Sequence, residues 1–386
     1  MRPLSWLRSF QGWMARWRAL TVPDCMRYTP IVDSLVRLGC ALLSFTLLCC
    51  SNQTTPHPAG LLVPGPSSVE AYAHVDAGIR AFGSNANPVL PGYNADPQVA
   101  LFDDTFYIYP TTDGFANWAS TSFSVFSSTN LVNWTNRGVI LDLPKELTWA
   151  TNRAWAPGIA LKGGVYYLYF AAAQAIGVAT SASPTGPFKD ALGHPLISAW
   201  SYGVQTIDPY PFIDDDGMAY LYFGSGGARV VRLSGDMISL AGTPRDITPT
   251  GYNEGSVMLK RGGTYYFFWS ENDTRSAKYQ VAYGRAQSPL GPFDRIGVIL
   301  EENPALGILA TGHNSILALP GRDEYYMVYH RFAIPGGDGY HREVCVDRMY
   351  FNSDGTIVPV RPTLQGLRAG VSPSPFELPV GAATTK

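Results

Sequence analysis

The chain has 386 residues and a formal net charge of −2, and charged residues make up only 15% of it. No basic cluster follows residue 40, which argues against nucleic acid as a partner because such proteins gather Lys and Arg to meet phosphates. Hydrophobic residues at 46% and aromatic residues at 13% predict a core large enough to be stable without disulfides.

Residues 1–50 are predicted to be a leader. Residues 38–50 form a 13-residue apolar run that follows basic residues and precedes a polar segment. This length is too short to span a bilayer and fits the hydrophobic region of a secretory signal peptide. A start at Met26 would give a more ordinary signal peptide, while a short anchoring helix or a lipid on Cys50 are the alternatives. We therefore expect a secreted, extracellular protein with no membrane contact after the leader is removed.

The rest of the chain divides into three parts by composition. Residues 51–84 are rich in Pro, Ser and Gly and are predicted to be a linker. Residues 85–363 are predicted to form the folded domain, and residues 364–386 a C-terminal tail. Only one of the five cysteines, Cys345, lies in the predicted domain, so no disulfide framework is expected.

A short aromatic strand recurs five times in the predicted domain. Each copy follows a tight polar or glycine turn, and the spacings between copies are 60, 53, 46 and 60 residues. Repeats of about this length, rich in β-formers, are typical of β-propeller blades. The sequence therefore predicts an all-β, five-bladed β-propeller. The second residues of the five copies are Tyr107, Tyr167, Tyr220, Tyr266 and Tyr326.

A second strand precedes each aromatic strand, and its first residue lies 11 to 13 positions before the aligned tyrosine. The first strand of a blade lines the axis of a propeller, so equivalent positions in the five repeats converge on one funnel. Like charges placed close together raise the pKa of one carboxyl group while another stays ionised. The residues at this position are Asp96, Ala156, Asp208, Glu254 and His313.

A single Asp-Pro pair is usually only a turn, but four polar residues in register are not explained by stability, since clustered like charges stabilise nothing. Paired carboxylates in an aromatic-lined funnel suit glycosidic bond hydrolysis, in which one protonates the leaving oxygen and another activates water or attacks the sugar. Trp118, Trp155 and Trp200 lie near axial strands or in loops. They are candidates to stack on sugar faces, although each alone is better explained by packing.

These motifs resemble glycoside hydrolase family 43 over residues 85–363. The segments that carry the resemblance are Asn94-Ala95-Asp96-Pro97, Trp155-Ala156-Pro157, Ile207-Asp208-Pro209, Asn253-Glu254-Gly255, Gly312-His313-Asn314-Ser315 and Tyr340-His341-Arg342-Glu343.

The resemblance implies an inverting mechanism with Asp96 as general base, Glu254 as general acid, and Asp208 raising the pKa of the acid and orienting it. It further implies that Arg342, Trp155 and His313 bind substrate. It requires no cofactor, although His313 is also the residue that would hold a structural calcium or another central ion, indirectly.

The expected substrate is a plant polysaccharide or oligosaccharide that carries a terminal pentose, with α-L-arabinofuranose first. β-Xylosidase, endo-arabinanase and a galactose-type specificity remain open, as do a retaining, invertase-like enzyme and a non-catalytic sugar-binding propeller. The sequence indicates no protein partner.

Overall fold

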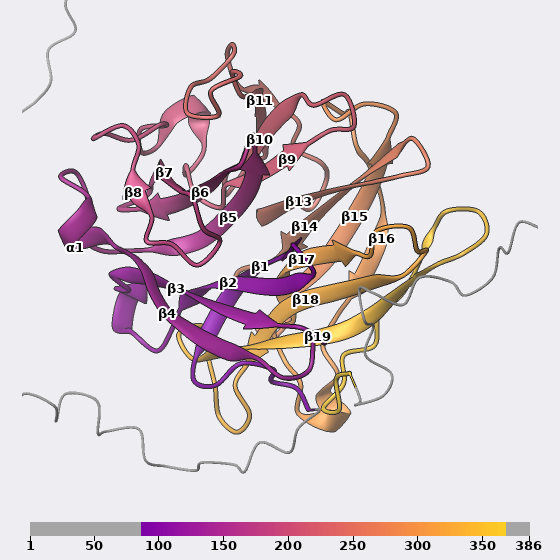
Figure 1. Cartoon of the computed structure of the whole chain (residues 1–386). Coiled ribbons are helices and arrows are strands. Elements are labelled where there is room, and N and C mark those ends of the chain that lie inside the picture. The colour runs from indigo at the N-terminus through magenta and orange to yellow at the C-terminus, as the bar shows by residue number, and fades with distance from the viewer. Residues whose placement is uncertain (1–85, 368–386) are drawn as a thin grey trace, which may run out of the picture. The chain divides into compact units, whose positions relative to one another are not determined.

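The computed structural model describes residues 86–367 (Figure 1). The predicted leader, the predicted linker and most of the predicted tail lie outside these residues. Within residues 86–367, no helix is long and apolar enough to cross a membrane.

Five four-stranded antiparallel sheets surround a common centre, which confirms the predicted five-bladed propeller (Figure 1). The first blade contains β1 (Asn94–Phe102), β2 (Thr105–Thr112), β3 (Ser122–Ser128) and β4 (Thr135–Asp142). The second contains β5 (Trp155–Lys162), β6 (Val165–Ala172), β7 (Ala175–Ser181) and β8 (Lys189–Asp190). The third contains β9 (Tyr210–Ile213), β10 (Ala219–Phe223), β11 (Arg229–Arg232) and β12 (Arg245–Asp246).

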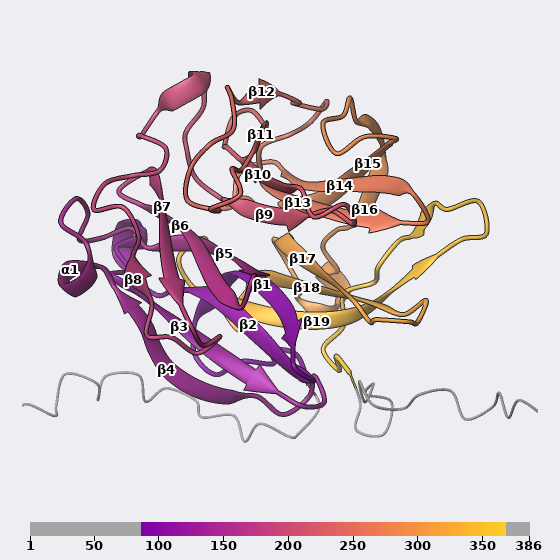
Figure 2. The same ribbon diagram turned by 45° about the horizontal axis from the view of Figure 1, so that its top comes forward.

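The fourth blade contains β13 (Glu254–Arg261), β14 (Thr264–Glu271), β15 (Gln280–Ala286) and β16 (Asp294–Leu300). The fifth contains β17 (Gly312–Ala318), β18 (Tyr325–Phe332), β19 (Arg342–Phe351) and β20 (Ile357–Val358). The connections carry the short helices α1 (Leu143–Glu146), η2 (Ala116–Trp118), η3 (Ser201–Gly203) and η4 (Pro304–Leu306). The turned view in Figure 2 shows the first strands β1, β5, β9, β13 and β17 nearest the centre.

The aromatic strands are the second strands of the blades, and they pack neighbouring sheets together. Each of the five hydrophobic clusters contains side chains from two adjacent blades. Tyr220, Tyr266 and Tyr326 are buried in these clusters, and Tyr107 and Tyr167 are half-buried at the edges of theirs. The repeated tyrosines therefore belong to the core between blades.

The two ends of the described chain meet on the fifth blade and close the ring. The backbone N–H of Asn87 donates to the carbonyl of Leu364 at 3.0 Å. The Asn87 side chain accepts from the N–H of Val346 at 2.8 Å and donates to Asp347 at 3.1 Å and to the carbonyl of Thr363 at 3.0 Å. One buried amide thus ties both ends of the domain to β19.

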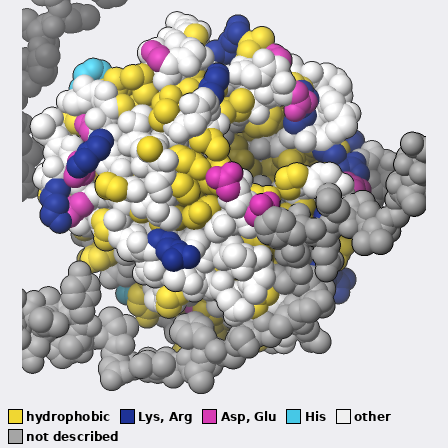
Figure 3. Space-filling model, viewed as in Figure 1, with side chains coloured by type: hydrophobic (Ala, Val, Ile, Leu, Met, Phe, Trp, Pro, Cys, Tyr) yellow, Lys and Arg dark blue, Asp and Glu magenta, His cyan; other side chains and the backbone are white. Residues whose placement is uncertain are grey.

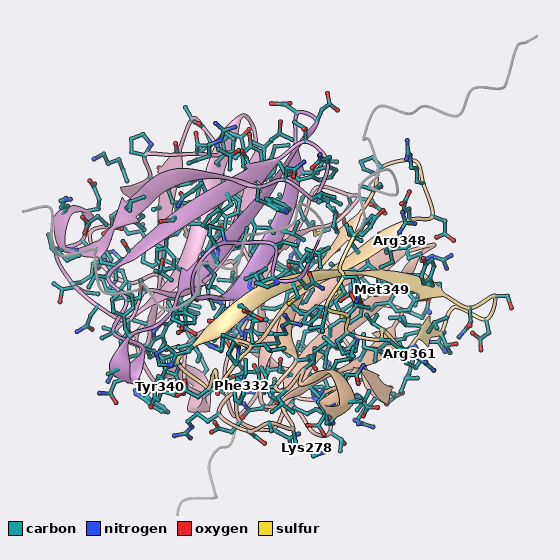
Figure 4. All side chains as sticks on the ribbon, turned by 90° about the horizontal axis from the view of Figure 1, so that it is seen from below. Lys278, Phe332, Tyr340, Arg348, Met349 and Arg361 are labelled. Atoms are coloured by element: carbon teal, nitrogen blue, oxygen red, sulfur yellow. The ribbon has the colours of Figure 1, made fainter. Side chains whose placement is uncertain are left out.

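Strands alternate in direction within each blade, so two kinds of connection lie on the same end of the ring. These are the segments that enter each first strand and the segments that join each second strand to the third. We call this end the entry face. Figure 4 shows Lys278 and Tyr340, which lie in such connections, well apart from Arg348 and Met349 near the other end of β19.

Candidate active site

A β-bulge interrupts the first strand at the predicted axial position of four blades. The strand register shifts between Ala95 and Gln98, and the same shift recurs in β5, β13 and β17. Bulges are common next to active sites because they re-aim side chains. The residue at the bulge, or at the matching site before β9, has a left-handed φ in every blade: Asp96 (47°), Ala156 (42°), Asp208 (57°), Gly255 (68°) and His313 (43°).

This register corrects one prediction. Gly255, and not Glu254, occupies the position of Asp96, because Glu254 pairs with Ser270 just before the bulge as Ala95 pairs with Thr111. Successive side chains of a strand point to opposite sides, so a one-residue offset gives Glu254 a different direction from the axial residues.

The second strands hold these bulges in place. Three bulge residues donate their backbone N–H to a side chain from the second strand of the preceding blade, and these side chains belong to Thr111, Ser270 and His330. The contacts are Ala156 N to Thr111 Oγ1 at 2.7 Å, His313 N to Ser270 Oγ at 2.8 Å, and Asp96 N to His330 Nδ1 at 3.1 Å. A left-handed backbone conformation costs a non-glycine residue about 1–2 kcal/mol, and these hydrogen bonds help to hold the three bulge residues in it.

A pocket of about 240 Å³ opens at the centre of the entry face. It brings together all the predicted site residues, and Trp118 as well, whereas Trp200 does not line it. The lining residues are Asp96, Trp118, Trp155, Gln205, Ile207, Asp208, Ser225, Asn253, Glu254, Asp273, Thr274, Arg275, His313 and Arg342.

Asp96 is buried beside cationic and polar nitrogens. Its Oδ1 lies 3.0 Å from Nη1 of Arg342 and 3.3 Å from Nδ1 of His313. Burial opposes ionisation of Asp96, but the charges of Arg342 and His313 hold its pKa well below the usual range. Asp96 is therefore an ionised carboxylate at neutral pH.

His330, which the sequence prediction missed, holds the backbone of Asp96 as a neutral ring. Burial and the charge of Arg342 together lower the pKa of His330 to about 4. Since Nδ1 accepts the N–H of Asp96, the proton of the neutral ring is on Nε2.

Arg342 is fixed by a buried carboxylate that the sequence prediction also missed. Asp113 accepts from Nε of Arg342 at 2.8 Å, from Nη2 at 3.3 Å and from the backbone N–H of Arg342 at 3.1 Å. Nη1 of Arg342 reaches Asp96 and, at 3.3 Å, Thr274 Oγ1. A guanidinium held on one edge by Asp113 presents its other edge to Asp96 and to the pocket.

Glu254 has the opposite electrostatic setting. Tyr279 donates its hydroxyl to Oε1 at 2.9 Å, and Ser225 Oγ lies 3.3 Å from Oε2. Burial and the charge of Asp96 together raise the pKa of Glu254 to about 7, against the hydrogen bond from Tyr279, which lowers it. Glu254 therefore carries its proton through much of the acidic and neutral range.

Asp208 lies beneath Glu254. Its Oδ2 accepts the N–H of Gly255 at 3.1 Å, which fixes the backbone next to Glu254. Burial raises the pKa of Asp208 well above its usual range, and the neighbouring charges of Glu254 and Asp96 raise it further. Two carboxyl groups this closely linked do not both ionise readily, and here the charge of Glu254 favours the protonated form of Asp208; that Asp208 raises the pKa of the acid stays a prediction.

Tyr279 is a further residue that the sequence prediction missed. Its ring stacks on His330 with centroids 5.5 Å apart and an interplanar angle of 9°. The ring also packs directly against Gly312, where it occupies the space that a side chain would need: a Cβ on Gly312 would lie 2.2 Å from the ring. Packing therefore sets where the Tyr279 hydroxyl meets Glu254.

A wall of aromatic rings bounds another side of the pocket. Trp155 Nε1 donates to the carbonyl of Trp118 at 2.7 Å, and Trp118 Nε1 donates to the carbonyl of Gly339 at 2.7 Å. Tyr340 packs on Trp118 with centroids 4.5 Å apart, and the Arg275 guanidinium lies 6.0 Å from the Trp118 ring. Loops from four blades thus join beside the pocket.

The predicted central ion has a small candidate cavity below the carboxylates. The cavity measures about 20 Å³, room for one water molecule, and the buried carboxamide of Asn314 lines it without a protein partner. Calcium takes six to eight oxygen ligands, and residues 86–367 contain no group of three or more His, Cys, Asp or Glu placed to hold a metal. The Asn314 carboxamide and the size of the cavity therefore suit a water molecule better than calcium. An ion near His313 stays a prediction.

Two carboxyl groups in one pocket, one favoured in its ionised form and one in its protonated form, are the groups that hydrolysis of a glycosidic bond needs. The comparison with known families agrees. A sequence profile of the glycosyl hydrolases family 43 matches residues 85–357, and the chain belongs to this family.

Individual relatives are similar over most of their length. A β-D-galactofuranosidase of Aspergillus niger is 43% identical over 73% of this chain and 86% of the relative. An arabinoxylan arabinofuranohydrolase of Bacillus subtilis is 30% identical over 80% of this chain and 70% of its own. The solved structure of an α-L-arabinofuranosidase from Clostridium thermocellum superimposes with a TM-score of 0.61 at 35% identity, covering 71% of this chain and 95% of that one.

Proposed function

We propose that the enzyme removes single terminal α-L-arabinofuranosyl units from arabinoxylan or its oligosaccharides, with inversion at the anomeric carbon. The observation that carries this proposal is the pairing of two carboxyl groups in one pocket, Asp96 beside Arg342 and Glu254 beside Tyr279 and Ser225. Its volume of about 240 Å³ favours release of one sugar over binding of a long chain inside it.

Asp96 is the general base in this mechanism. It takes a proton from a water molecule, and the water oxygen attacks the anomeric carbon on the face opposite the leaving group. Arg342 and His313 keep Asp96 ionised, as the base role needs. Arg342, held by Asp113, also offers N–H groups to the hydroxyls of the bound sugar.

Glu254 is the general acid, and the two hydrogen bonds it receives distinguish its oxygens. Oε1 accepts the shorter bond, from Tyr279 at 2.9 Å, and Oε2 the longer one, from the pocket-lining Ser225 at 3.3 Å, so we assign the acidic proton to Oε2. Glu254 transfers this proton to the glycosidic oxygen as the bond to the anomeric carbon breaks. Asp208 accepts the N–H of Gly255 and so holds the backbone next to the acid.

The choice of sugar rests on the relatives. The Bacillus subtilis relative is named for arabinofuranose, and a 32% identical relative from Humicola insolens is named a xylosidase/arabinosidase. The 43% identity to a β-D-galactofuranosidase makes β-D-galactofuranosides the second candidate. The two furanoses share ring stereochemistry and differ by one exocyclic hydroxymethyl group. With the predicted leader, this substrate class favours action outside the cell.

Hydrolysis of nitrophenyl α-L-arabinofuranoside, β-D-galactofuranoside and β-D-xyloside tests the proposal. We expect the arabinofuranoside to be cleaved with the highest kcat/KM, and proton NMR to show the inverted anomer first. A retained anomer would remove the base role of Asp96, and a clear preference for either other sugar would replace the proposed substrate.

Two variants test the roles of the carboxylates. Asp96→Asn should lose activity on aryl glycosides with good and poor leaving groups alike. Glu254→Gln should lose activity mainly with poor leaving groups, because good ones need no proton. If Glu254→Gln is as active as wild type on both, Glu254 is not the acid.

A further inference from the structure

Exposed aromatic side chains gather on the entry face. Of the five exposed aromatic residues in the part of the chain that the structure describes, four lie in entry-face connections, and only Tyr350 lies toward the other end of the ring. Exposed aromatic patches beside a pocket are typical of ligand-binding surfaces. The four residues are Tyr93, Phe115, Trp200 and Tyr202.

Trp200 and Tyr202 belong to the connection between β8 and β9, which runs directly into the active site. Further along this connection, Gln205 pairs with Ser225 through two backbone hydrogen bonds of 2.9 and 3.2 Å, and both residues line the pocket. Ser225 in turn contacts Glu254. The two aromatic residues therefore lie on the side of the pocket that holds the acid.

The loop backbone is firmly held although its rings face solvent. Trp200 is 64% exposed and Tyr202 is 43% exposed, and both have left-handed φ values of 57° and 58°. The carbonyl of Tyr202 accepts from Nε of Arg229 at 3.1 Å, and Thr206 Oγ1 donates to the carbonyl of Ser198 at 2.9 Å. Strained backbone that keeps large apolar rings in water points to a use for them in binding.

We propose that Trp200 and Tyr202 form a platform for the main-chain sugars of a branched polysaccharide, next to the unit that carries the cleaved side chain. This inference rests on the proposed function. The acid protonates the oxygen that stays with the leaving group, so the rest of the polymer leaves the pocket on the side of Glu254, where the platform lies.

The surroundings suit a neutral carbohydrate. The C–H faces of pyranose rings pack on the electron-rich faces of aromatic rings. Arg229 beside the platform is paired with Asp246 at 3.0 Å, so it adds little net charge there. On the opposite end of the ring, which Figure 3 shows, Lys and Arg side chains are scattered rather than gathered in one patch.

The test compares a polymer with a small substrate. Trp200→Ala and Tyr202→Ala should lower kcat/KM for arabinose release from arabinoxylan by about tenfold. Both should leave kcat/KM for nitrophenyl α-L-arabinofuranoside within about twofold of wild type, because that substrate ends at the pocket. Tyr350→Ala changes a tyrosine that is 56% exposed, between the values of Tyr202 and Trp200, and lies toward the other end of the ring; it is the matched control and should change neither rate.

Unchanged arabinoxylan rates in both platform variants would overturn the inference, and so would equal losses on both substrates, since these would place the effect inside the pocket. If sedimentation shows an oligomer that Trp200→Ala dissociates, the surface binds a second copy and the inference is also wrong. Failure of the proposed function is distinct, because wild type itself would then not cleave the aryl arabinofuranoside. In that case the inference fails with the function on which it rests.

Discussion

Replacing Tyr279 by Phe tests whether this tyrosine sets the acidity of Glu254. The hydroxyl of Tyr279 donates to Oε1 of Glu254 at 2.9 Å and stabilises the ionised carboxylate. A hydrogen bond to a charged group contributes about 1.5–3 kcal/mol, and one pKa unit corresponds to about 1.4 kcal/mol. Because Ser225 remains near Oε2, we expect the loss to lie at the low end of this energy range, which raises the pKa of Glu254 by about one unit.

The pH dependence of kcat/KM measures this change. Activity requires protonated Glu254, so in wild type it should fall as the pH rises through about 7. In Tyr279→Phe the alkaline limb should move upward by about one pH unit. With poor leaving groups kcat should fall about tenfold, because the acid loses the contact that orients it.

Tyr222→Phe is the matched control for this experiment. Tyr222 is also buried, but its hydroxyl donates to the carbonyl of Pro289 at 2.6 Å between the third and fourth blades, away from the pocket lining. It should lose comparable stability in thermal unfolding and keep the wild-type pH profile. An alkaline limb in Tyr279→Phe that stays in place or moves to lower pH would refute the reasoning about Glu254.

Three further variants address the general base Asp96, the general acid Glu254 and the closure of the propeller by Asn87. Arg342→Lys should raise the pKa of Asp96 and move the acid limb of kcat/KM to higher pH, since Lys lacks the forked contact; an unmoved acid limb would contradict this. Gly312→Ala puts a Cβ 2.2 Å from the Tyr279 ring and should lower kcat for poor leaving groups only; an equal loss with good ones would point elsewhere. Asn87→Ala should lower the free energy of unfolding by about 2–4 kcal/mol and Tm by roughly 5–10 °C. Calorimetry measures this, and kcat should not change.

The fold was predictable because every blade must pack against two neighbours. That requirement repeats an aromatic second strand, and the repeat makes Tyr107 and its counterparts visible in a single sequence. Counting back from these tyrosines also located Asp96, Asp208 and His313. The structure shows that all three have a left-handed φ, at the first strand or just before it.

The same counting misplaced Glu254 by one residue. The turns between first and second strands vary in length, so distance along the chain does not determine register across a bulge. Only the strand pairing shows that Gly255 holds the axial position. A glycine there tolerates the left-handed φ of 68°, so no side chain takes the axial direction in the fourth blade.

Other site residues divide into those with a sequence signal and those without one. Thr111, Ser270 and His330 all lie four positions after an aligned tyrosine, so the same repeat could have revealed them. Tyr279 and Asp113 come from regions whose lengths differ between blades, and nothing in the repeat marks them. Their roles depend on contacts between blades that only the three-dimensional structure defines.

Each sheet of the propeller is built from one uninterrupted stretch of chain, and no strand is borrowed from another blade. The seam between the fifth and first blades is therefore held by side chains, by the Asn87 clamp and by single backbone hydrogen bonds such as Gly114 N to the carbonyl of Tyr340 at 2.7 Å. Because the two ends meet at 3.0 Å there, a short linker could join them, and new termini could be opened in a hairpin on the side opposite the entry face. In such a circular permutant the blade order around the axis, and hence the catalytic pocket, would be unchanged. The position at which the chain enters the propeller therefore does not determine how the blades are arranged.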